Sequence, residues 1–516
     1  MSFIRYTASA DNTIVNAYQP NLSTRGTGSN AGEADIVEVF SVYGRQTPYS
    51  SNSAGITLAS QELSRVLIQF PTTAISTDRS AGAIPASGSV SFFLRMFNAP
   101  HSRTVPREYK LNVVAVSQSW QEGYGLDLEG YKDLVKNNSG SNWIQAQKGT
   151  NWTYVGGDYL TSSTDSTDYR YEQTFKTGLE DLQLDVTPMV ERWLAGDVEN
   201  NGMGVHLNKR YEAYYSSSNG LNTGSIINNT GGAEQSYYTK RFFARGSQYF
   251  FKRPVLEARW DSCRRDDRAN FYFSSSRMPA ADNLNTIYFY NYVRGRLTNL
   301  PNVGTGEVLV SLYSGSANNT VPSGSKLSLY DSNTNITGGW VSTGIYSCSI
   351  GIVSSSTTTL YDVWHSGGVE YFTGSISPKF ISTGMTDMQP SYVIAMRNLK
   401  DRYNEKEKVR FSMYARHKNW KPNIYTVANA SPETLPIVSA SYRVYRLLDN
   451  YPAVSYGTAS RNHTGLSYDV SGNYFDFDMA VLDPGYAYAF KFSIYDETQS
   501  SWIEQDETFK FRLEEK

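Results

Sequence analysis

The sequence predicts an all-β protein built from several sandwich domains, because of its composition, its alternating hydrophobic segments and its shortage of helical ones. Aromatic residues make up 14% of the 516 residues, and 39 of them are tyrosines. Tyr, Phe, Val and Thr suit a pleated, half-buried surface, whereas Gly, Asn and Ser supply turns. A chain rich in both groups is typical of short strands joined by many loops.

Alternation of apolar and polar residues marks the expected strands, which are short and bounded by Gly, Pro, Asn or Ser. The clearest alternation is YAYAFKFSI at residues 486–494. A period of two places every second side chain on the same face of a sheet. The other expected strands lie at residues 65–70, 91–97, 111–116, 307–313 and 409–414.

One segment predicts a short helix, TPMVERWLAG at residues 187–196. Thr187 can cap its start, Pro188 suits the first helical position, and Gly196 ends the run. Its apolar residues, Trp193 among them, would share one face and dock on a sheet. The sequence has no heptads and no collagen-like triplets, so a long fibrous shaft is not expected.

The length suggests about three domains, at roughly 100–200 residues per domain. A charged, apolar-poor cluster, DSCRRDDR at residues 261–268, marks one break, and a second lies near residue 378. We therefore expect units at 1–262, 263–378 and 379–516. The last two match an immunoglobulin-like sandwich in size and in the spacing of their strand segments.

The third unit carries a candidate corner motif, LDPGYAY at residues 482–488. A Leu, a Pro-Gly turn and a Tyr soon afterwards resemble the tyrosine corner of immunoglobulin- and fibronectin-like sandwiches. In that corner the Tyr hydroxyl bonds back to a loop backbone group. The alternative interpretation is an ordinary turn with an exposed Tyr.

The first unit contains a dense series of Trp, Gly and Asp motifs. In this order they resemble the DNRLRE-type, or disaggregatase-related, module, a family classed among the carbohydrate-binding modules. The resemblance covers the first unit only, and it departs from the family pattern in inserts around residues 125–141 and 211–238. The motifs are Trp120-x-Glu122-Gly123, Trp143, Gly149-x-x-Trp152, Gly156-Gly157-Asp158, Asp185-Val186-Thr187, Trp193 and Asn200-x-Gly202.

The resemblance implies a jelly-roll-like β-sandwich that is able to bind carbohydrate. The full expectation is thus an N-terminal jelly-roll-like β-sandwich followed by two immunoglobulin-like β-sandwich domains. Sugars stack on flat aromatic faces, which makes Tyr124, Trp143 and Trp152 the candidate carbohydrate-binding residues. The competing interpretation is that Trp120, Trp143, Trp152 and Trp193 fill the gap between two sheets.

No motif in the sequence indicates catalysis, so we expect a protein that is not an enzyme and has no catalytic residue, metal site or cofactor. The five histidines form no ligand pattern, and His206 lies inside an apparent strand, where a structural role is expected. Cys263 and Cys348 are expected to be reduced thiols. There is neither a nucleophile elbow nor a glycine-rich phosphate loop before a helix.

One pair of acidic residues needs separate consideration. Asp476 and Asp478 would lie on one face of a strand, with Asp469 nearby. A solvated strand face is the expected explanation. A calcium site, which needs hard oxygen ligands, and a glycosidase carboxylate pair are the alternatives.

The charge balance and the apolar segments limit the expected partners. Forty-seven basic residues nearly cancel forty-nine acidic ones, so neither nucleic acid nor an anionic membrane surface is expected as a partner. The sequence shows no secretory signal and no apolar run of about 18 residues, so membrane insertion is not expected. We expect a chain that folds in a cytoplasm.

An adhesive module without an export signal suits a virion protein, which assembles in the host cytoplasm and leaves by lysis. The whole chain is also similar to structural proteins of marine tailed phages. Residues 392–399 contribute to this similarity. This implies a multi-copy neck, tail, baseplate or capsid-surface protein. Its partners would be other virion structural proteins and host-surface glycans.

The Tyr-rich strand at residues 287–292 offers aromatic area for docking to such virion proteins. The other interpretation of that strand is simple alternation between core and solvent. The alternative function for the whole chain is a cellular carbohydrate-binding protein, or the non-catalytic part of a polysaccharide-degrading system.

Overall fold

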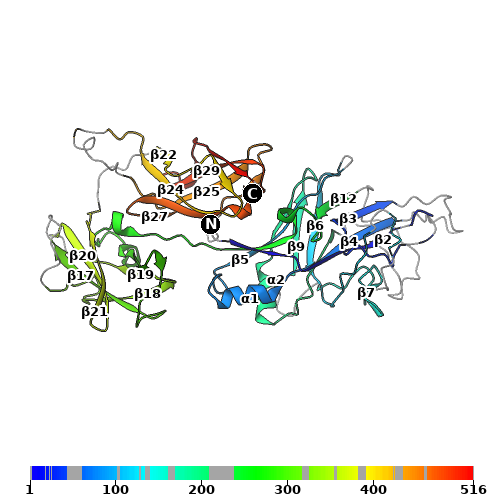
Figure 1. Ribbon diagram of the computed structural model, residues 1–516, viewed down its shortest axis with the longest axis horizontal. Coiled ribbons are helices and arrows are strands. Elements are labelled where there is room, and N and C mark those ends of the chain that lie inside the picture. Colours follow the sequence, from blue (N-terminus) through cyan, green and yellow to red (C-terminus); the bar gives the residue numbers. More distant parts are fainter. Residues whose placement is uncertain are drawn as a thin grey trace. The chain divides into compact units, whose positions relative to one another are not determined.

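The computed structural model confirms an all-β protein with several sheets (Figure 1). Contacts within the chain divide it into two compact units, Phe3–Trp260 and Asp261–Lys516, which are described separately. The structure describes residues 3–17, 19–21, 24, 26–43, 61–101, 105–126, 130–133, 140–160, 169–208, 238–315, 325–353, 357–381, 391–421, 424, 434–457 and 462–514.

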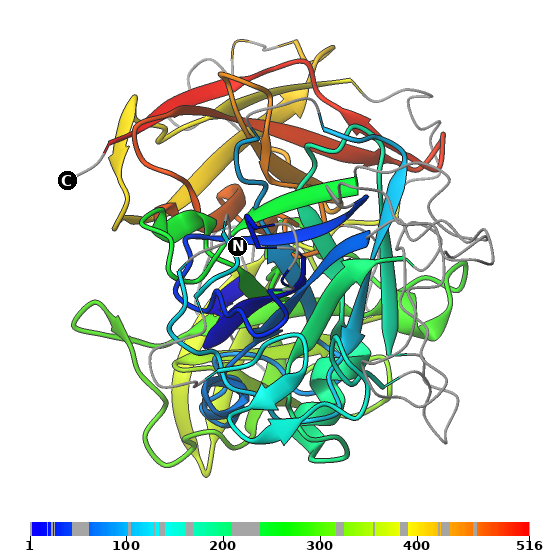
Figure 2. The same cartoon turned by 90° about the vertical axis from the view of Figure 1, so that its right-hand side faces the viewer.

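The unit Phe3–Trp260 is a sandwich of two antiparallel sheets, and Figure 2 faces this unit. The four-stranded sheet has the order β1 (Phe3–Thr7), β13 (Val255–Arg259), β5 (Ser91–Met96) and β10 (Leu182–Asp185). The seven-stranded sheet has the order β12 (Tyr238–Phe243), β3 (Ile36–Tyr43), β4 (Gln61–Gln69), β11 (Met203–Leu207), β6 (Tyr109–Ala115) and β9 (Arg170–Phe175), and β2 (Ala10–Asn16) also pairs with β4.

The core of this unit lies between the two sheets, because every second side chain of each strand points inward. Val66 and Ile68 of β4 meet Phe92 and Leu94 of β5 in one buried cluster. A second, smaller cluster lies on the outer face of the seven-stranded sheet, where Leu67 of β4 packs with residues from the 140–160 segment. That segment includes the short hairpin of β7 (Gln145–Gln147) and β8 (Thr150–Asn151).

The predicted helix is confirmed as α2 (Thr187–Ala195), which packs Trp193 into the core and ends at Gly196 with a left-handed φ of 81°. The predicted cap is wrong by one residue. The N-cap is Val186, and Thr187 is already helical. Instead of capping, the Thr187 hydroxyl accepts the N–H of Phe92 at 2.8 Å, because the helix start lies against β5.

Sequence reasoning missed a second helix, α1 (Thr72–Ser80). Its only buried residue is Ile75, so its sequence carries almost no apolar stripe. Two polar contacts hold it in place. Arg79 forms a bidentate pair with Glu191 of α2 at 2.9 and 2.7 Å, and Asp78 accepts the hydroxyl of Tyr6 at 2.7 Å.

The unit Asp261–Lys516 contains two separate hydrophobic cores. The first belongs to a six-stranded sheet whose end strands approach each other, since the rings of Phe289 and Phe372 lie 5.2 Å apart. The sheet order is β14 (Asn285–Tyr290), β19 (Ile345–Ile350), β18 (Ile336–Ser342), β17 (Val308–Gly315), β20 (Thr359–Ser366) and β21 (Val369–Ile376), beside a hairpin of β15 (Tyr292–Val293) and β16 (Arg296–Leu297).

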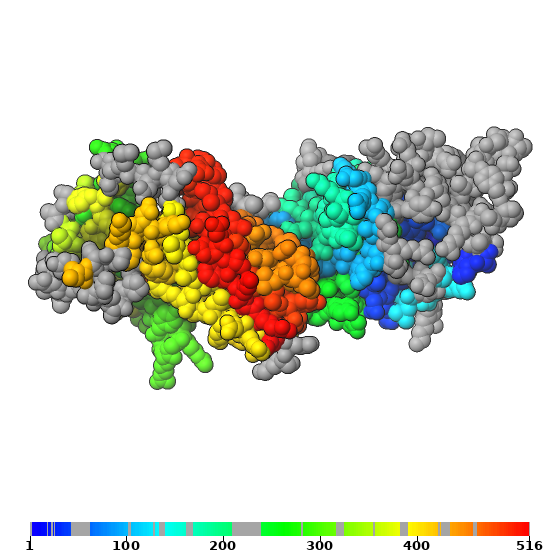
Figure 3. Space-filling model, turned by 90° about the horizontal axis from the view of Figure 1, so that it is seen from above, coloured from blue at the N-terminus to red at the C-terminus, as the bar shows by residue number. Residues whose placement is uncertain are grey.

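The second core lies between two further sheets, and their orange and red residues form one face in Figure 3. Stacked aromatic rings fill it, as with Tyr442 and Phe475 at 4.2 Å. One sheet is β22 (Tyr392–Met396), β24 (Lys408–His417), β28 (Gly472–Asp478) and β27 (Ser467–Asp469). The other is β23 (Arg402–Asn404), β31 (Phe509–Glu514), β29 (Ala487–Asp496), β25 (Ala440–Arg446) and β26 (Pro452–Val454), and β30 (Ser501–Glu504) pairs with β29.

The tyrosine corner is confirmed in this second core. The buried hydroxyl of Tyr488 donates to the backbone carbonyl of Asp483 at 2.9 Å. Leu482 is buried beside it, and Gly485 takes the left-handed φ of 86° that the turn requires. The division of the chain at residues 262 and 378 into three domains stays a prediction.

Candidate functional site

A cleft of about 520 Å³ lies on the seven-stranded sheet of the unit Phe3–Trp260. Its floor consists of strand residues that alternate with core residues, so they point away from the sandwich core. The lining combines cationic, amide and aromatic side chains: Arg65, Asn112, Val114, Tyr154, Val155, Gly157, Tyr159, Arg170, His206 and Asn208.

The wall of the cleft is a tight turn at residues 153–158, which the Gly156-Gly157-Asp158 motif builds. The Asp158 carboxylate accepts the backbone N–H groups of Thr153 and Tyr154, each at 2.7 Å. Gly156 and Gly157 have φ values of 87° and 105°, which side chains rarely allow. The turn leaves the ring of Tyr154 69% exposed at the mouth of the cleft.

Arg65 joins this wall to the floor. Its Nη1 donates to the carbonyl of Gly156 at 2.9 Å, and the hydroxyl of Tyr159 donates to the same carbonyl at 2.8 Å. The guanidinium also lies 5.3 Å from the ring of Trp143 and 5.7 Å from that of Tyr159. The wall therefore has a fixed position before any ligand arrives.

The described lining of the cleft contains two cationic side chains, Arg65 and Arg170, and no Asp or Glu. Glu172 lies beside it on the same strand as Arg170. Lys110 hydrogen-bonds the Glu172 carboxylate at 2.5 Å and holds its pKa below the ordinary value, against the effect of burial. Asn208 donates to the same carboxylate at 2.7 Å.

The structure does not bring the three predicted carbohydrate-binding residues together. Trp143 and Trp152 are only 2% and 4% exposed, because both fill the cluster on the outer face of the sheet. Neither indole offers a face to a sugar, which argues against stacking at these two residues. The interpretation that they fill the gap between two sheets is also wrong for Trp143 and Trp152, because their cluster lies outside the sandwich, whereas Trp193 does pack between the sheets. Tyr124 is 61% exposed but does not line the cleft.

Sequence reasoning missed Tyr154, the aromatic residue that the cleft exposes. The available signal was its position between Trp152, which anchors the segment, and the Gly156-Gly157 turn. Trp152 donates from Nε1 to the carbonyl of Asn142 at 2.9 Å.

The Trp120-x-Glu122-Gly123 motif also has a scaffold role. Arg245 forms a bidentate pair with Glu122 at 2.9 and 2.8 Å, and the same carboxylate accepts the N–H of Asp11 at 2.9 Å. Burial raises the pKa of Asp11 to about 7, and the neighbouring Glu122 charge adds to that effect. Trp120 donates from Nε1 to the carbonyl of Asn201 at 2.8 Å.

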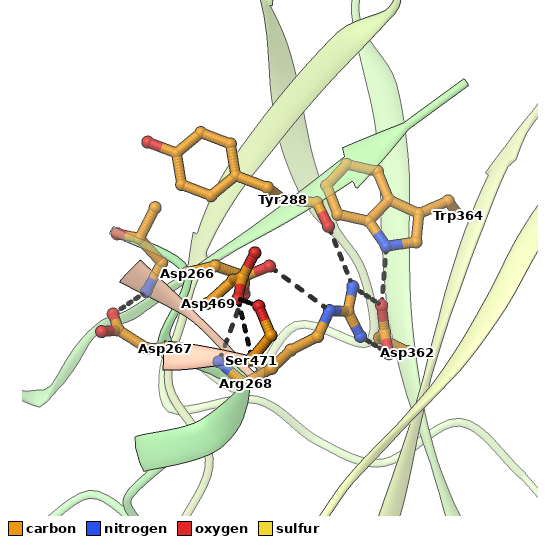
Figure 4. Close-up of polar contacts among 9 residues, drawn as sticks. Asp266, Asp267, Arg268, Tyr288, Asp362, Trp364, Asp469 and Ser471 are labelled. Carbon is orange, nitrogen blue, oxygen red and sulfur yellow. Dashed lines mark hydrogen bonds and ion pairs between the residues drawn. The ribbon is translucent and has the colours of Figure 1, made fainter. Parts of the chain in front are cut away.

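A second polar cluster lies in the unit Asp261–Lys516, within the charged segment 261–271 (Figure 4). Arg268 forms a bidentate pair with Asp362 of β20 at 2.5 and 2.6 Å and donates to the carbonyl of Tyr288 of β14 at 3.1 Å. Trp364 donates from Nε1 to the same Asp362 at 2.7 Å. The charged residues are thus bonded to the first core of this unit.

The same segment also bonds to the second core. Asp267 accepts the N–H of Thr286 through one oxygen and the hydroxyl of Tyr468 of β27 through the other, both at 2.7 Å. The backbone N–H of Asp266 donates to the carbonyl of Tyr468 at 3.0 Å, and burial raises the pKa of the Asp266 carboxyl to about 6. The segment is a packed strap that connects two cores.

The Tyr-rich strand β14 also contacts both cores of this unit. Ile287 and Phe289 are buried in the first core, as alternation predicts. Tyr288 and Tyr290 point to the other side, stack 6.3 Å apart and are half-buried, and Tyr290 interacts with the hydroxyl of Tyr474 in β28. These two rings therefore pack between the two cores of this unit.

Cationic side chains pair with two residues of the predicted acidic strand face. Arg410 forms a bidentate pair with Asp476 at 2.7 and 3.0 Å, and Lys408 pairs with Asp478 at 3.1 Å. Asp469 accepts the N–H of Ser471 at 2.7 Å. Among the residues that the structure describes, no group of three or more His, Cys, Asp or Glu could hold a metal ion.

No described helix is both long and apolar enough to span a bilayer.

No described protein family matches the sequence, and no curated protein matches it. Among solved structures, the chain is similar to trypsin-activated alpha-2-macroglobulin from Escherichia coli at 11% identity and a TM-score of 0.14, over 82% of this chain and 30% of that one. The BSP domain of a biofilm-associated protein is similar at 8% identity and a TM-score of 0.15, over 99% and 92%. The chain thus spans about a third of the macroglobulin chain. TM-scores this low indicate neither a shared fold nor a shared function.

Proposed function

We propose that this chain is a non-enzymatic structural and adhesion protein whose unit Phe3–Trp260 binds a glycan in the cleft. The observation that carries the proposal is the lining of that cleft. An exposed aromatic ring, Tyr154, stands over a floor of amide and cationic side chains in a concave site. Ligand sites in proteins commonly combine an apolar surface with a few well-placed polar groups.

The charges of the cleft indicate which glycans should be tested first. Arg65 and Arg170 supply guanidinium groups, which match the geometry of a carboxylate. The amides of Asn112 and Asn208 supply donors and acceptors for hydroxyl groups. Sugars that carry a carboxylate are therefore expected to bind more tightly than neutral ones.

For the setting in which the protein works, we propose a tailed-phage particle on which the chain is a multi-copy structural component. The strap at 261–271 supports a load-bearing role, because Asp267 and Arg268 tie two cores without a flexible spacer. The resemblance of the first unit to a carbohydrate-binding module supports contact with host-surface glycans. The partners would be other virion structural proteins.

A glycan array with the purified full chain, followed by titration of the best ligand, tests the binding site. Tyr154→Ala should weaken binding about fivefold or more, since stacking of a flat ligand such as a base on one aromatic ring contributes about 1–3 kcal/mol. Arg170→Ala should weaken binding of acidic glycans selectively. Tyr124→Ala, an exposed Tyr outside the cleft, is the matched control and should bind normally.

Two outcomes would contradict parts of the proposal. If Tyr124→Ala lost binding and Tyr154→Ala kept it, the site would lie elsewhere on the unit. If the chain bound glycans but was absent from purified particles by mass spectrometry, the cellular carbohydrate-binding alternative would replace the virion setting.

A further inference from the structure

Lys240 of β12 is a lysine with no exposed surface, in the unit Phe3–Trp260 but outside the cleft. Its Nζ lies 2.6 Å from Oδ1 of Asn98, 2.9 Å from the carbonyl of Gly178 and 2.7 Å from the carbonyl of Glu180. Because a C=O bond is about 1.2 Å long, Nζ also lies within about 4 Å of the Asn98 side-chain carbonyl carbon. An amine and an amide carbon are thus held close together.

The surroundings of Lys240 exclude water and favour the neutral amine. The rings of Phe175 and Phe242 lie 5.0 and 5.2 Å from Nζ. Burial lowers the pKa of Lys240 to about 8, and the carboxylates of Asp181 and Glu180 offset this only in part. A neutral amine has the lone pair that an ammonium lacks, and desolvation makes it a stronger nucleophile.

Glu180, whose backbone carbonyl accepts Nζ, also acts on Lys240 through the charge of its carboxylate. Oε2 of Glu180 is buried and has no hydrogen-bond partner among the described residues. Burial opposes ionisation of this group, but hydrogen bonds from the backbone of Thr177, Gly178 and Glu180 and from the Thr177 side chain together outweigh it, the Thr177 N–H donating to the other oxygen at 2.7 Å. The pKa of Glu180 therefore lies below its ordinary value, and the carboxylate is able to accept a proton.

From this arrangement we propose that Lys240 and Asn98 form an intramolecular isopeptide bond. Nζ, having lost a proton to the Glu180 carboxylate, attacks the side-chain carbonyl carbon of Asn98. A new C–N bond forms, a second proton passes from Nζ to Nδ2, and the bond from that carbon to Nδ2 breaks. Nδ2 leaves with three hydrogens as ammonia, and the first proton stays on Glu180. The reaction of one amine with one primary amide gives one secondary amide and one ammonia, so it needs no oxidant or cofactor.

The bond would tie the two sheets of the sandwich together. Asn98 lies two residues after the end of β5 in the four-stranded sheet, and its backbone bridges Phe242. Lys240 lies in β12 of the seven-stranded sheet. A covalent link between the sheets resists their separation, which would suit a protein that transmits force, whether or not the cleft binds glycans.

Mass spectrometry of the purified full chain tests the bond directly. The intact mass is expected to be lower than the sequence mass by one ammonia, and proteolysis should release one linked peptide pair that contains Lys240 and Asn98. An unlinked pair after prolonged incubation of the folded protein at pH 8 to 9 would overturn the proposal. Loss of ammonia within the Asn98 peptide alone, which marks a cyclic imide, would overturn it too.

Variants separate the roles of the three groups. Lys240→Arg and Asn98→Ala should abolish the linked pair, and Glu180→Gln should slow its formation at least about tenfold, as expected for loss of a positioned proton carrier. Lys110→Arg, at an exposed lysine on the same sheet, is the matched control and should link normally. Linkage of Glu180→Gln at the normal rate would remove Glu180 from the proposal.

Discussion

Lys240 and Arg268 are two buried cations whose partners differ in charge. Every direct hydrogen-bond acceptor of Lys240 is a neutral carbonyl, from Asn98, Gly178 and Glu180. Arg268 faces the carboxylate of Asp362 in a bidentate pair. Burial lowers the pKa of Lys240 to about 8. Burial also opposes the charge of Arg268, but the hydrogen bonds and charge of Asp362, together with the charge of Asp266, raise the pKa of Arg268 above its ordinary value.

The comparison teaches that burial alone does not decide what a cation does. A carboxylate partner keeps the charge in place, so Arg268 works as a permanent structural clamp. Neutral acceptors hold the position of Lys240 but favour its charge much less, so the amine is able to lose its proton and react. The expected consequences differ in size and in pH dependence.

The largest effect is expected from Arg268→Ala. It would leave Asp362, which has no exposed surface, as an uncompensated buried carboxylate. Removal of one partner from a buried pair costs about 3–5 kcal/mol. Hydrogen-exchange mass spectrometry on peptides from β14 and β20 would measure this loss as a lower free energy of opening.

The control for this experiment is Arg402→Ala, at an exposed pair with Glu514. Exposed pairs contribute about 0–1 kcal/mol, so β14 and β20 should exchange normally in that variant. If Arg268→Ala behaved like the control, the charge of Asp362 would be compensated in some other way and the contrast with Lys240 would fail.

Much of the fold was predictable, because strands and turns follow from local pattern. The alternation at residues 486–494 matches β29, and the corner motif places Tyr488 correctly. Helix α1 was not predictable in this way, since one buried residue, Ile75, gives no periodic signal. Its position depends on the contacts of Arg79 and Asp78 with distant residues, which no local pattern reveals.

The candidate site was less predictable, because a residue type does not say which way a side chain points. The sequence makes Trp143 and Trp152 candidates for carbohydrate binding, yet both are buried, and Tyr154, which no motif singles out, is the exposed aromatic residue of the cleft. The charged run at 261–268 has the composition of a solvated linker. Two of its charged residues, Arg268 and Asp267, instead bond to Asp362 and Tyr468, which come from far along the chain.

A pH effect of intermediate size is expected from Lys240 where the isopeptide bond is absent, as in Asn98→Ala. The folded-state pKa of about 8 lies below the unfolded value near 10.4, so the unfolded chain binds more protons between these values. Stability should therefore rise with pH from about 8 to about 10, by at most about 3 kcal/mol. Below pH 8 the full penalty for burying the ammonium applies.

Denaturant unfolding of Asn98→Ala across this pH range, compared with Asn98→Ala/Lys240→Met, isolates the effect from tyrosine titration. The slope should be present in the first protein and absent from the second. Equal slopes would show that Lys240 does not titrate in this window, and the contrast with the permanently charged Arg268 would then lose its basis.

The smallest effect is expected from Tyr468→Phe, which removes a neutral donor from the strap and leaves its charges intact. The Tyr468 hydroxyl donates to Asp267 at 2.7 Å, and the ring is buried, so the substitution keeps the packing. A hydrogen bond to a charged group contributes about 1.5–3 kcal/mol, and Asp267 retains the N–H of Thr286. We expect a loss of stability near the lower end of that range.

Tyr456→Phe, whose hydroxyl donates to Glu504 in an exposed hydrogen bond, is the control and should cost clearly less stability. A loss from Tyr468→Phe as large as that from Arg268→Ala would mean that neutral donors, rather than the buried charge pair, hold the strap in place.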